Sequence, residues 1–311
     1  MDFSFLCNAC SLSSLPLCDG ISNSSGDVGT PTLRQTSLGG SDESRRQIGD
    51  GSYRQAGDVS GNSSADINSA DINSMGFLAN IKGLPLLHIN ARSLLPKLSE
   101  IRLILRDSKA AFLAVSETWL DESVGDGETA IDDYNFVRRD RNRHGGGVGI
   151  YIRKDINFNV RSDLLKENLE CIFVDVLFPR TKSFVVGSCY RPPDDVSFLE
   201  KFQEVLSLIT PGTEMYLLGD LNLCFSRNEG MVKSYKRLLA SFSIEQIINE
   251  ATRITATTST IIDHFLTNCN SKIRSCGVLN CSFSDHQIIY GVRGSFLKQT
   301  SPPPCKKHSV F

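Results

Sequence analysis

The sequence has no apolar run long enough to cross a membrane, only one tryptophan and five histidines, and few aromatic residues in its first quarter. A membrane-spanning helix needs about 20 consecutive apolar residues, and no stretch approaches that length. The N-terminus also lacks the basic segment and long apolar core of a secretory signal. We therefore expect an intracellular protein that is neither secreted nor inserted in a membrane.

Residues 1–80 hold 16 Ser and 10 Gly but only four aromatic residues. This composition offers too little apolar surface to offset the entropy lost when a chain becomes ordered. The segment ADINSADINS at 65–74 repeats a five-residue unit, which is too short and too seldom repeated for a solenoid. We predict a disordered arm over 1–80, a folded domain over 81–295 and a short tail over 296–311.

Neither sign of charge is strongly in excess. The whole chain has a formal net charge of −2, which divides into −5 for the arm and +3 for the remainder. A mild basic excess permits a nucleic-acid partner but does not identify one. Any such partner has to be argued from a site.

Cysteine is plentiful, with ten residues. The segment CNAC at 7–10 has the spacing of half a zinc-binding motif, but no second pair and no histidine stand at ligand spacing nearby. Several other cysteines lie in apolar runs, where a thiol packs as a small hydrophobic group. Free thiols are therefore favoured over a metal site.

From about residue 82 the sequence alternates between strand and helix patterns. LPLLHIN at 84–90 and EMYLLGDLN at 214–222 are short apolar runs typical of buried strands, whereas 196–209 has the apolar spacing of an amphipathic helix. This alternation predicts an α/β domain with the sheet inside and the helices outside. Further strands are expected within 111–117, 145–156, 169–178, 183–193, 261–267 and 286–292, and further helices within 95–107 and 231–243.

Polar residues stand at or beside the ends of these apolar runs. Ligand sites of layered α/β folds collect at strand ends, so residues far apart in sequence can meet there. Any one of them alone is more often a turn or a cap. The candidates are Asn90, Glu117, Tyr190, Asp220, Asn222, Asp263, Asp285 and His286.

Two of these segments carry a physical argument of their own. In GDLN, Gly219 would let the backbone bend as the strand leaves the sheet, and Asp220 and Asn222 would face the same side of an extended chain. Glu117 follows an apolar strand and needs a partner for its charge, which a divalent cation would supply.

Seven segments occur in the order, and at roughly the spacing, of the endonuclease domain of non-LTR retrotransposons. They are HINARSL, SETWL, HGGGVGIYIR, CYRPP, LLGDLN, STIIDHFLTN and SDH, and the resemblance covers about residues 84–293. That domain belongs to the endonuclease/exonuclease/phosphatase family, together with the apurinic endonucleases and DNase I. The resemblance implies a two-layered α/β sandwich with the site at one edge. It also implies Mg²⁺-assisted hydrolysis of a phosphodiester in double-stranded DNA, with Mn²⁺ as an alternative ion.

The resemblance also implies roles for the matched residues. Glu117 resembles the metal-binding carboxylate, and Asp285 would assist the metal. Asp220 resembles the residue that positions or deprotonates the attacking water. Asn90 and Asn222 would hold that water and the phosphate oxygens.

Three further matched residues would act on the phosphate. Tyr190 would donate a hydrogen bond to it, His286 would stabilise the charged phosphorane, and Asp263 would fix the tautomer of His286. A carboxylate paired with an imidazole raises its basicity and orients the ring. A hard cation with oxygen ligands suits phosphodiester hydrolysis, and this would explain a site rich in carboxylates.

One departure concerns the residue two positions after Asn90. Apurinic endonucleases have an acidic residue there, whereas this chain has Arg92. The change removes one potential metal ligand, so we expect modest metal affinity.

We therefore expect a monomeric, nuclear, metal-dependent DNA endonuclease that nicks its target and derives from a retrotransposon. A complete retroelement protein would continue into a reverse transcriptase, so we expect this chain to be a truncated copy of an element that lacks one. Two alternatives stay open. One is a catalytically inactive remnant or binding module, and the other is a phosphatase of the same superfamily, because function belongs to the site and not to the fold.

Overall fold

The computed structural model describes residues 75–179 and 182–294. Most of the predicted arm, with its CNAC segment and its repeat, and the predicted tail lie outside these residues. Within the predicted arm, Gly76–Asn80 form the short helix α2. Met75 and Leu78 are buried in a hydrophobic cluster, so the folded part already includes residues before 81.

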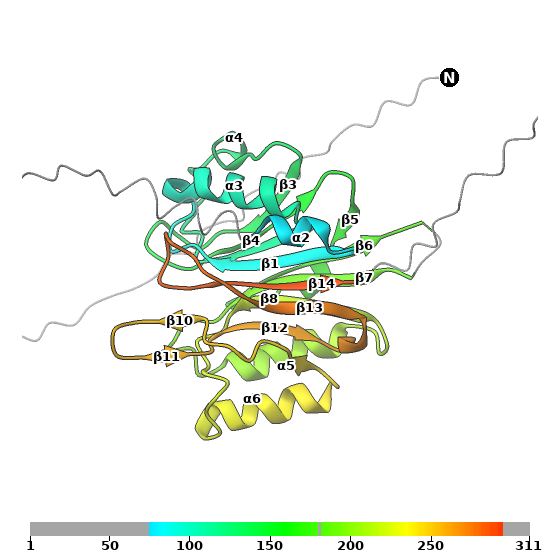
Figure 1. Ribbon diagram of the computed structural model, residues 1–311. Coiled ribbons are helices and arrows are strands. Elements are labelled where there is room, and N and C mark those ends of the chain that lie inside the picture. Colours follow the sequence, from blue (N-terminus) through cyan, green and yellow to red (C-terminus); the bar gives the residue numbers. More distant parts are fainter. Residues whose placement is uncertain (1–74, 180–181, 295–311) are drawn as a thin grey trace, which may run out of the picture. The chain divides into compact units, whose positions relative to one another are not determined.

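Two mixed sheets of six strands each pack face to face, with helices on their outer faces (Figure 1). The first sheet has the order β13 (Ile273–Leu279), β14 (Ile288–Arg293), β1 (Leu84–Asn90), β2 (Phe112–Ser116), β4 (Val148–Arg153), β3 (Tyr134–Arg139). The second sheet has the order β5 (Asn157–Val160), β6 (Glu170–Leu177), β7 (Phe184–Tyr190), β8 (Glu214–Asp220), β12 (Asp263–Thr267), β9 (Glu245–Gln246). This arrangement confirms the predicted α/β sandwich.

Helices cover the outer face of each sheet (Figure 1). Helix α3 (Leu98–Ser108) packs with α2 over the first sheet, and α5 (Phe198–Leu208) and α6 (Gly230–Ser241) pack over the second. The expected apolar spacing therefore predicted all three long helices to within a few residues. Shorter helical segments are η1 (Leu95–Lys97), α4 (Asp126–Thr129), η2 (Ser162–Leu164) and η3 (Asn270–Lys272). None of the helices in the described part of the chain is long and apolar enough to span a bilayer.

The layer between the sheets forms one of the hydrophobic clusters of the described residues. It is filled from the first sheet by Leu86 and Ala114, and from the second by Leu218 and Phe265. Successive residues of a strand point to opposite faces, so Leu86 enters this layer while Leu87 packs under the helices. By the same alternation, residues 88 and 90 of β1 face the second sheet.

Gly219 has a different role from the one expected. It lies inside β8, and a Cβ at this position would overlap the backbone carbonyl of Cys189 on the parallel neighbour β7. The residue is therefore explained by close approach of two strands and not by a bend.

A small hairpin, β10 (Arg253–Ile254) paired with β11 (Ser259–Thr260), forms a separate two-stranded sheet. Its first residue also makes an isolated antiparallel bridge with His286. The hairpin is therefore attached to the same end of the molecule as the candidate residues.

Candidate active site

The strand ends bring the candidate residues together in two rows. Tyr190, Asp220 and Asp263 lie side by side in register across β7, β8 and β12 of the second sheet. Across β1 and β2 of the first sheet, Asn90 lies opposite Ser116, the residue before Glu117. Because the two sheets stack, both rows end at the same edge, as the sequence predicted.

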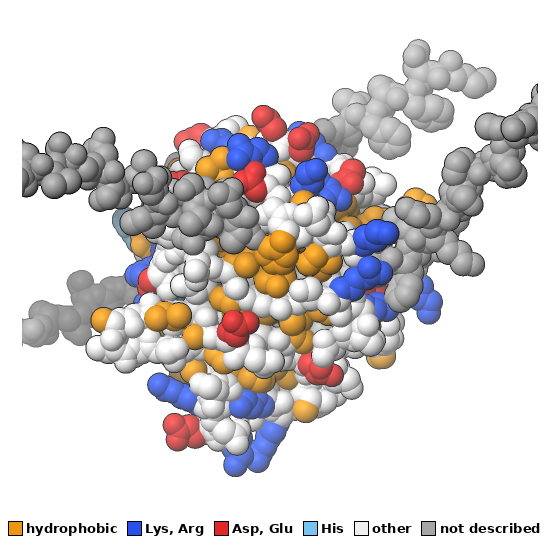
Figure 2. Space-filling view, viewed as in Figure 1, with side chains coloured by type: hydrophobic (Ala, Val, Ile, Leu, Met, Phe, Trp, Pro, Cys, Tyr) orange, Lys and Arg blue, Asp and Glu red, His pale blue; other side chains and the backbone are white. Residues whose placement is uncertain are grey.

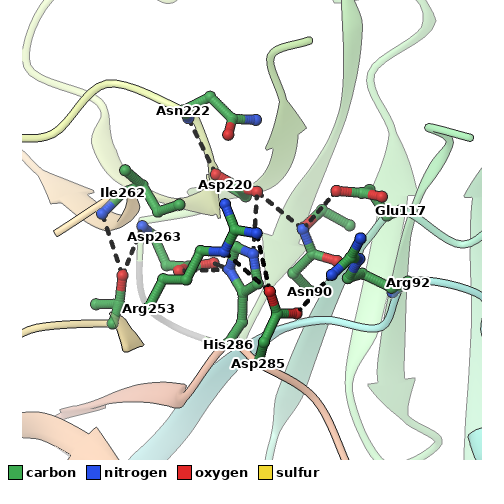
Figure 3. A network of polar contacts seen from close by, with 12 residues as sticks. Asn90, Arg92, Glu117, Asp220, Asn222, Arg253, Ile262, Asp263, Asp285 and His286 are labelled. Atoms are coloured by element: carbon green, nitrogen blue, oxygen red, sulfur yellow. Dashed lines mark hydrogen bonds and ion pairs between the residues drawn. The ribbon is translucent and has the colours of Figure 1, made fainter. Parts of the chain in front are cut away.

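Asn90 joins the two rows. Its Nδ2 donates to Oε1 of Glu117 at 2.8 Å and to Oδ2 of Asp220 at 2.8 Å (Figure 3). Asn90 and Asp220 are fully buried, whereas Glu117 is partly exposed. The amide therefore connects carboxylates of the two sheets, one at the floor of the site and one nearer its mouth.

His286 stands between two buried carboxylates. Its Nδ1 lies 2.9 Å and 3.1 Å from the two oxygens of Asp263, and its Nε2 lies 4.0 Å from Oδ2 of Asp220. Burial acts to lower the pKa of this imidazole, but the carboxylates of Asp263 and then Asp220 outweigh it, so the pKa of His286 is raised. The ring is thus held in one orientation and favoured as the cation.

The carboxyl group of Asp220 has a strongly raised pKa. Burial, and next the charge of Asp263 beside it, raise its pKa to about 7. Two carboxylates on adjacent buried strands repel each other in a medium that solvates charge poorly. A group that gains and loses a proton near neutral pH is suited to proton transfer.

Asn222 does not continue the extended chain as expected. Its backbone is left-handed, with φ of 49°, and its N–H donates to Oδ1 of Asp220 at 3.0 Å. Its side-chain Nδ2 donates to the carbonyl oxygen of Arg191 at 2.9 Å. The two residues therefore meet through a turn, because the strand ends at Asp220.

Left-handed backbone is concentrated at this edge. Such conformations cost energy outside glycine and persist where the surroundings impose them, often at functional sites. Glu117 adopts one with φ of 51°, and the Nε1 of Trp119 donates to its Oε2 at 3.1 Å. The positive-φ residues that follow β1, β2 and β8 are Arg92, Ser93, Glu117, Trp119 and Asn222.

Two candidates lie at the margins of this arrangement. Tyr190 is buried at the end of β7, with the guanidinium of Arg141 5.9 Å from its ring centroid. Asp285 is held by arginines, with Arg92 on one carboxylate oxygen and Arg253 on the other (Figure 3). The sequence indicated neither arginine contact.

A buried imidazole that sequence reasoning missed lies behind Asp263. His88 Nε2 is 2.9 Å from Oγ of Ser116, and its Nδ1 is 3.7 Å from Oδ1 of Asp263. Among the described residues no hydrogen-bond partner reaches this Nδ1. Burial, as the largest effect, lowers the pKa of His88 to about 4, so the ring is neutral. His88 stands two residues before Asn90 on one strand, so the sequence could have indicated that both side chains face the same side.

The site's residues fit a hard divalent cation. Ligand atoms of Asp220, Asp263 and His286 lie within 4.8 Å of one another. Because His286 is favoured as the cation, the carboxylates of Asp220 and, nearer the mouth, Glu117 are the groups suited to hold the ion. The donor set is rich in oxygen, which suits Mg²⁺ and Mn²⁺. A cation would also offset the negative charge of these buried carboxylates.

A family model described as "Endonuclease/Exonuclease/phosphatase family" matches residues 78–286. The chain belongs to this family. Its members are phosphoester hydrolases that use divalent metal ions, which is consistent with the acidic cluster described above. A search among curated proteins finds no match.

Solved structures with this fold include several nucleic-acid enzymes. The endonuclease domain of TRAS1, a telomere-specific non-LTR retrotransposon, has a TM-score of 0.56 and 16% identity, covering 68% of this chain and 98% of its own. An AP endonuclease from Archaeoglobus fulgidus has a TM-score of 0.55 and 15% identity, covering 68% and 99%. The 3′-5′ exonuclease NExo from Neisseria meningitidis has a TM-score of 0.56 and 15% identity, covering 68% and 100%. At these identities the likeness establishes the fold.

Proposed function

We propose that this protein is a DNA endonuclease that nicks double-stranded DNA with the help of Mg²⁺ or Mn²⁺ and that derives from a non-LTR retrotransposon. The observation that carries the proposal is the contact of Asn90 with both Glu117 and Asp220, next to the pair of His286 and Asp263. This arrangement combines a water-activating carboxylate, a cationic imidazole and an outer carboxylate in one volume.

The surroundings of each side chain in the site suit it to one role in phosphodiester hydrolysis. Asp220, whose pKa is near neutrality, accepts a proton from the attacking water while Asn90 holds its carboxylate. His286, kept cationic by Asp263, stabilises negative charge on the phosphoryl oxygens. The phenol of Tyr190 donates to the same phosphate. The backbone N–H of Asn222 donates to Oδ1 of Asp220, the carboxylate oxygen that Asn90 does not contact.

A divalent cation would supply charge neutralisation at the phosphate and the leaving oxygen. Glu117 would hold it from the first sheet, and the carboxylate of Asp220 would face it from the second. Asp285, which the sequence also suggested as a ligand, has both carboxylate oxygens bonded to arginines.

Relaxation of supercoiled plasmid tests the proposal. The wild-type protein should convert plasmid to the nicked form in the presence of Mg²⁺, and His286→Ala and Asp220→Ala should not. Equal nicking by all three proteins would indicate a contaminating nuclease. No nicking by wild type under Mg²⁺ or Mn²⁺ would favour the inactive remnant or binding module.

A phosphatase of the same superfamily is the second candidate, because one neighbour of this fold is described as the 3′ phosphatase NExo from Neisseria bound to product DNA hairpin. Release of phosphate from inositol phosphates or from 3′-phosphorylated DNA, without plasmid nicking, would support it.

DNA as the substrate leads us to propose nuclear residence and action as a monomer. Exclusively cytoplasmic fluorescence of a tagged protein would contradict the first, and a dimeric mass in sedimentation equilibrium would contradict the second.

A further inference from the structure

Two arginines from distant segments converge on one carboxylate beside His286. The Nη1 of Arg92 donates to Oδ1 of Asp285 at 3.0 Å, and the Nε of Arg253 donates to Oδ2 at 2.9 Å (Figure 3). The Nη2 of Arg253 also lies 2.9 Å from Oδ2. Both oxygens of this carboxylate are therefore engaged by guanidinium groups.

The local charge does not balance. Two cations share one anion, so the cluster of Arg92, Arg253 and Asp285 carries one excess positive charge beside the acidic residues of the site. A guanidinium has five N–H donors, and the carboxylate takes only some of them. The side chains of Arg92 and Arg253 keep 46% and 37% of their surface exposed, so their remaining donors are accessible.

The two arginines are also fixed to the catalytic residues by the backbone. Arg92 follows Asn90 by two residues, and its N–H donates to Oδ1 of Asn90 at 3.0 Å, with a left-handed φ of 41°. Arg253 makes an isolated β-bridge with His286. Neither guanidinium is at the end of a free loop.

On the face shown in Figure 2, the Lys and Arg side chains of the described residues do not form one continuous patch. Among the described residues drawn there, Lys and Arg lie in separate groups with hydrophobic and acidic side chains between them.

We propose that Arg92 and Arg253, positioned by Asp285, bind a backbone phosphate next to the scissile phosphate. This inference rests on the proposed function and narrows its substrate to nucleic-acid strands that carry a neighbouring phosphate. Guanidinium groups match the geometry and charge of phosphate oxygens. Asp285 is then a positioning residue and not a metal ligand.

The test compares two substrates, supercoiled plasmid and bis(4-nitrophenyl) phosphate, which is a phosphodiester with no neighbouring phosphate. For Arg92→Ala and Arg253→Ala we expect kcat/KM on plasmid to fall by about tenfold to a hundredfold, as for loss of a charged hydrogen bond. Most of the fall should be in KM. Hydrolysis of the small diester should stay within about twofold of wild type. Arg253→Lys keeps the charge but loses the planar guanidinium group. Its kcat/KM on plasmid should lie between that of wild type and that of Arg253→Ala.

A matched control removes the same charge from the outer surface of α6. Lys233→Ala and Arg237→Ala, both exposed on that helix, should leave both substrates unaffected. Equal loss on plasmid and on the small diester would place the arginines on the scissile phosphate and overturn the proposal. No loss on either substrate would overturn it as well.

Binding provides a readout that does not need turnover. With a labelled duplex in EDTA, log Kd should vary less steeply with log salt by about one unit for each arginine removed. An unchanged slope in both variants contradicts the phosphate site, even if the wild-type protein cuts nothing and the proposed function itself fails. Asp285→Asn should leave the Mg²⁺ concentration for half-maximal nicking unchanged, and a rise of about tenfold would make Asp285 a metal ligand.

Discussion

Nδ1 of His286 lies 2.9 Å from Oδ2 of Asp263, and both side chains are buried. Asp263 begins β12 of the second sheet, and His286 precedes β14 of the first. The pair therefore joins the two sheets at the edge where the site forms. Thr252 supports it, because its Oγ1 accepts the backbone N–H of Asp263 at 3.0 Å.

Replacing Asp263 by Asn should lower kcat for nicking by about 10²- to 10⁴-fold with little change in KM, because the imidazole loses the anion that orients and charges it. Initial rates on supercoiled plasmid measure this. Asp175→Asn, a partly exposed carboxylate of β6, is the matched control. A kcat within about threefold of wild type for Asp263→Asn would remove this pair from the mechanism.

The affinity for the divalent metal ion should depend on the carboxylate of Glu117. EDTA should abolish nicking, and Glu117→Gln should raise the Mg²⁺ concentration for half-maximal rate by at least about tenfold, since a ligand charge is lost. Isothermal titration of the protein with Mn²⁺ gives the same comparison without turnover. The same metal affinity in both proteins would show that Glu117 is not a ligand.

Gly219→Ala should destabilise the fold by about 2–4 kcal/mol, because a methyl group would force β7 and β8 apart. Urea unfolding followed by circular dichroism measures this change. Gly127→Ala in α4 is the control, as a Cβ there meets no atom within 4 Å, and its effect should stay within about 1 kcal/mol. Equal midpoints for the two variants would show that the strands can separate without cost.

Acid should unfold the protein partly through its buried imidazoles. Burial, as the largest effect, lowers the pKa of both His88 and His264 from 6.5 to about 4. A lowered folded-state pKa means that the unfolded chain binds the proton first. This part of the stability is present above pH 6.5 and is lost as pH falls from 6.5 to 4, by about 3 kcal/mol for each ring.

His264→Phe isolates one of these contributions. The variant should be less stable at pH 7 by about 1–3 kcal/mol, because the hydroxyl of Tyr235 loses the ring nitrogen at 3.0 Å. Its stability should then fall less steeply than that of wild type between pH 6.5 and 4. Parallel curves from urea titrations across this range would argue against a buried neutral His264.

The strands that carry the site were predictable because they are the most buried. β1 and β8 lie between helices and the opposite sheet, and every residue in them is buried, which produces the continuous apolar runs seen in the sequence. The polar residue that ends each run is conspicuous for the same reason. Edge strands β3 and β13 were not predicted, since most of their residues are half-exposed and their pattern is indistinct.

Contacts between side chains were harder to foresee. Arg92 and Asp285 are 193 positions apart, and no local pattern links two charged side chains over that distance. The turn at Asn222 depends on where β8 ends, which hydrophobic periodicity fixes only to within a few residues. His88 lies inside an apolar run and resembled an ordinary core residue until its neighbour across the sheets was known.

Asn90 donates to a carboxylate of its own sheet and to one of the opposite sheet, so the reactive geometry depends on how the two halves of the sandwich are aligned. A shear between them would lengthen the bond from Asn90 to Asp220 and shift His286 relative to Asp220, while leaving the strands of each half paired. Nicking should accordingly disappear at urea concentrations below those at which secondary structure melts. Substitutions deep in the intervening apolar layer, such as Phe265→Leu, should slow the enzyme without unfolding it.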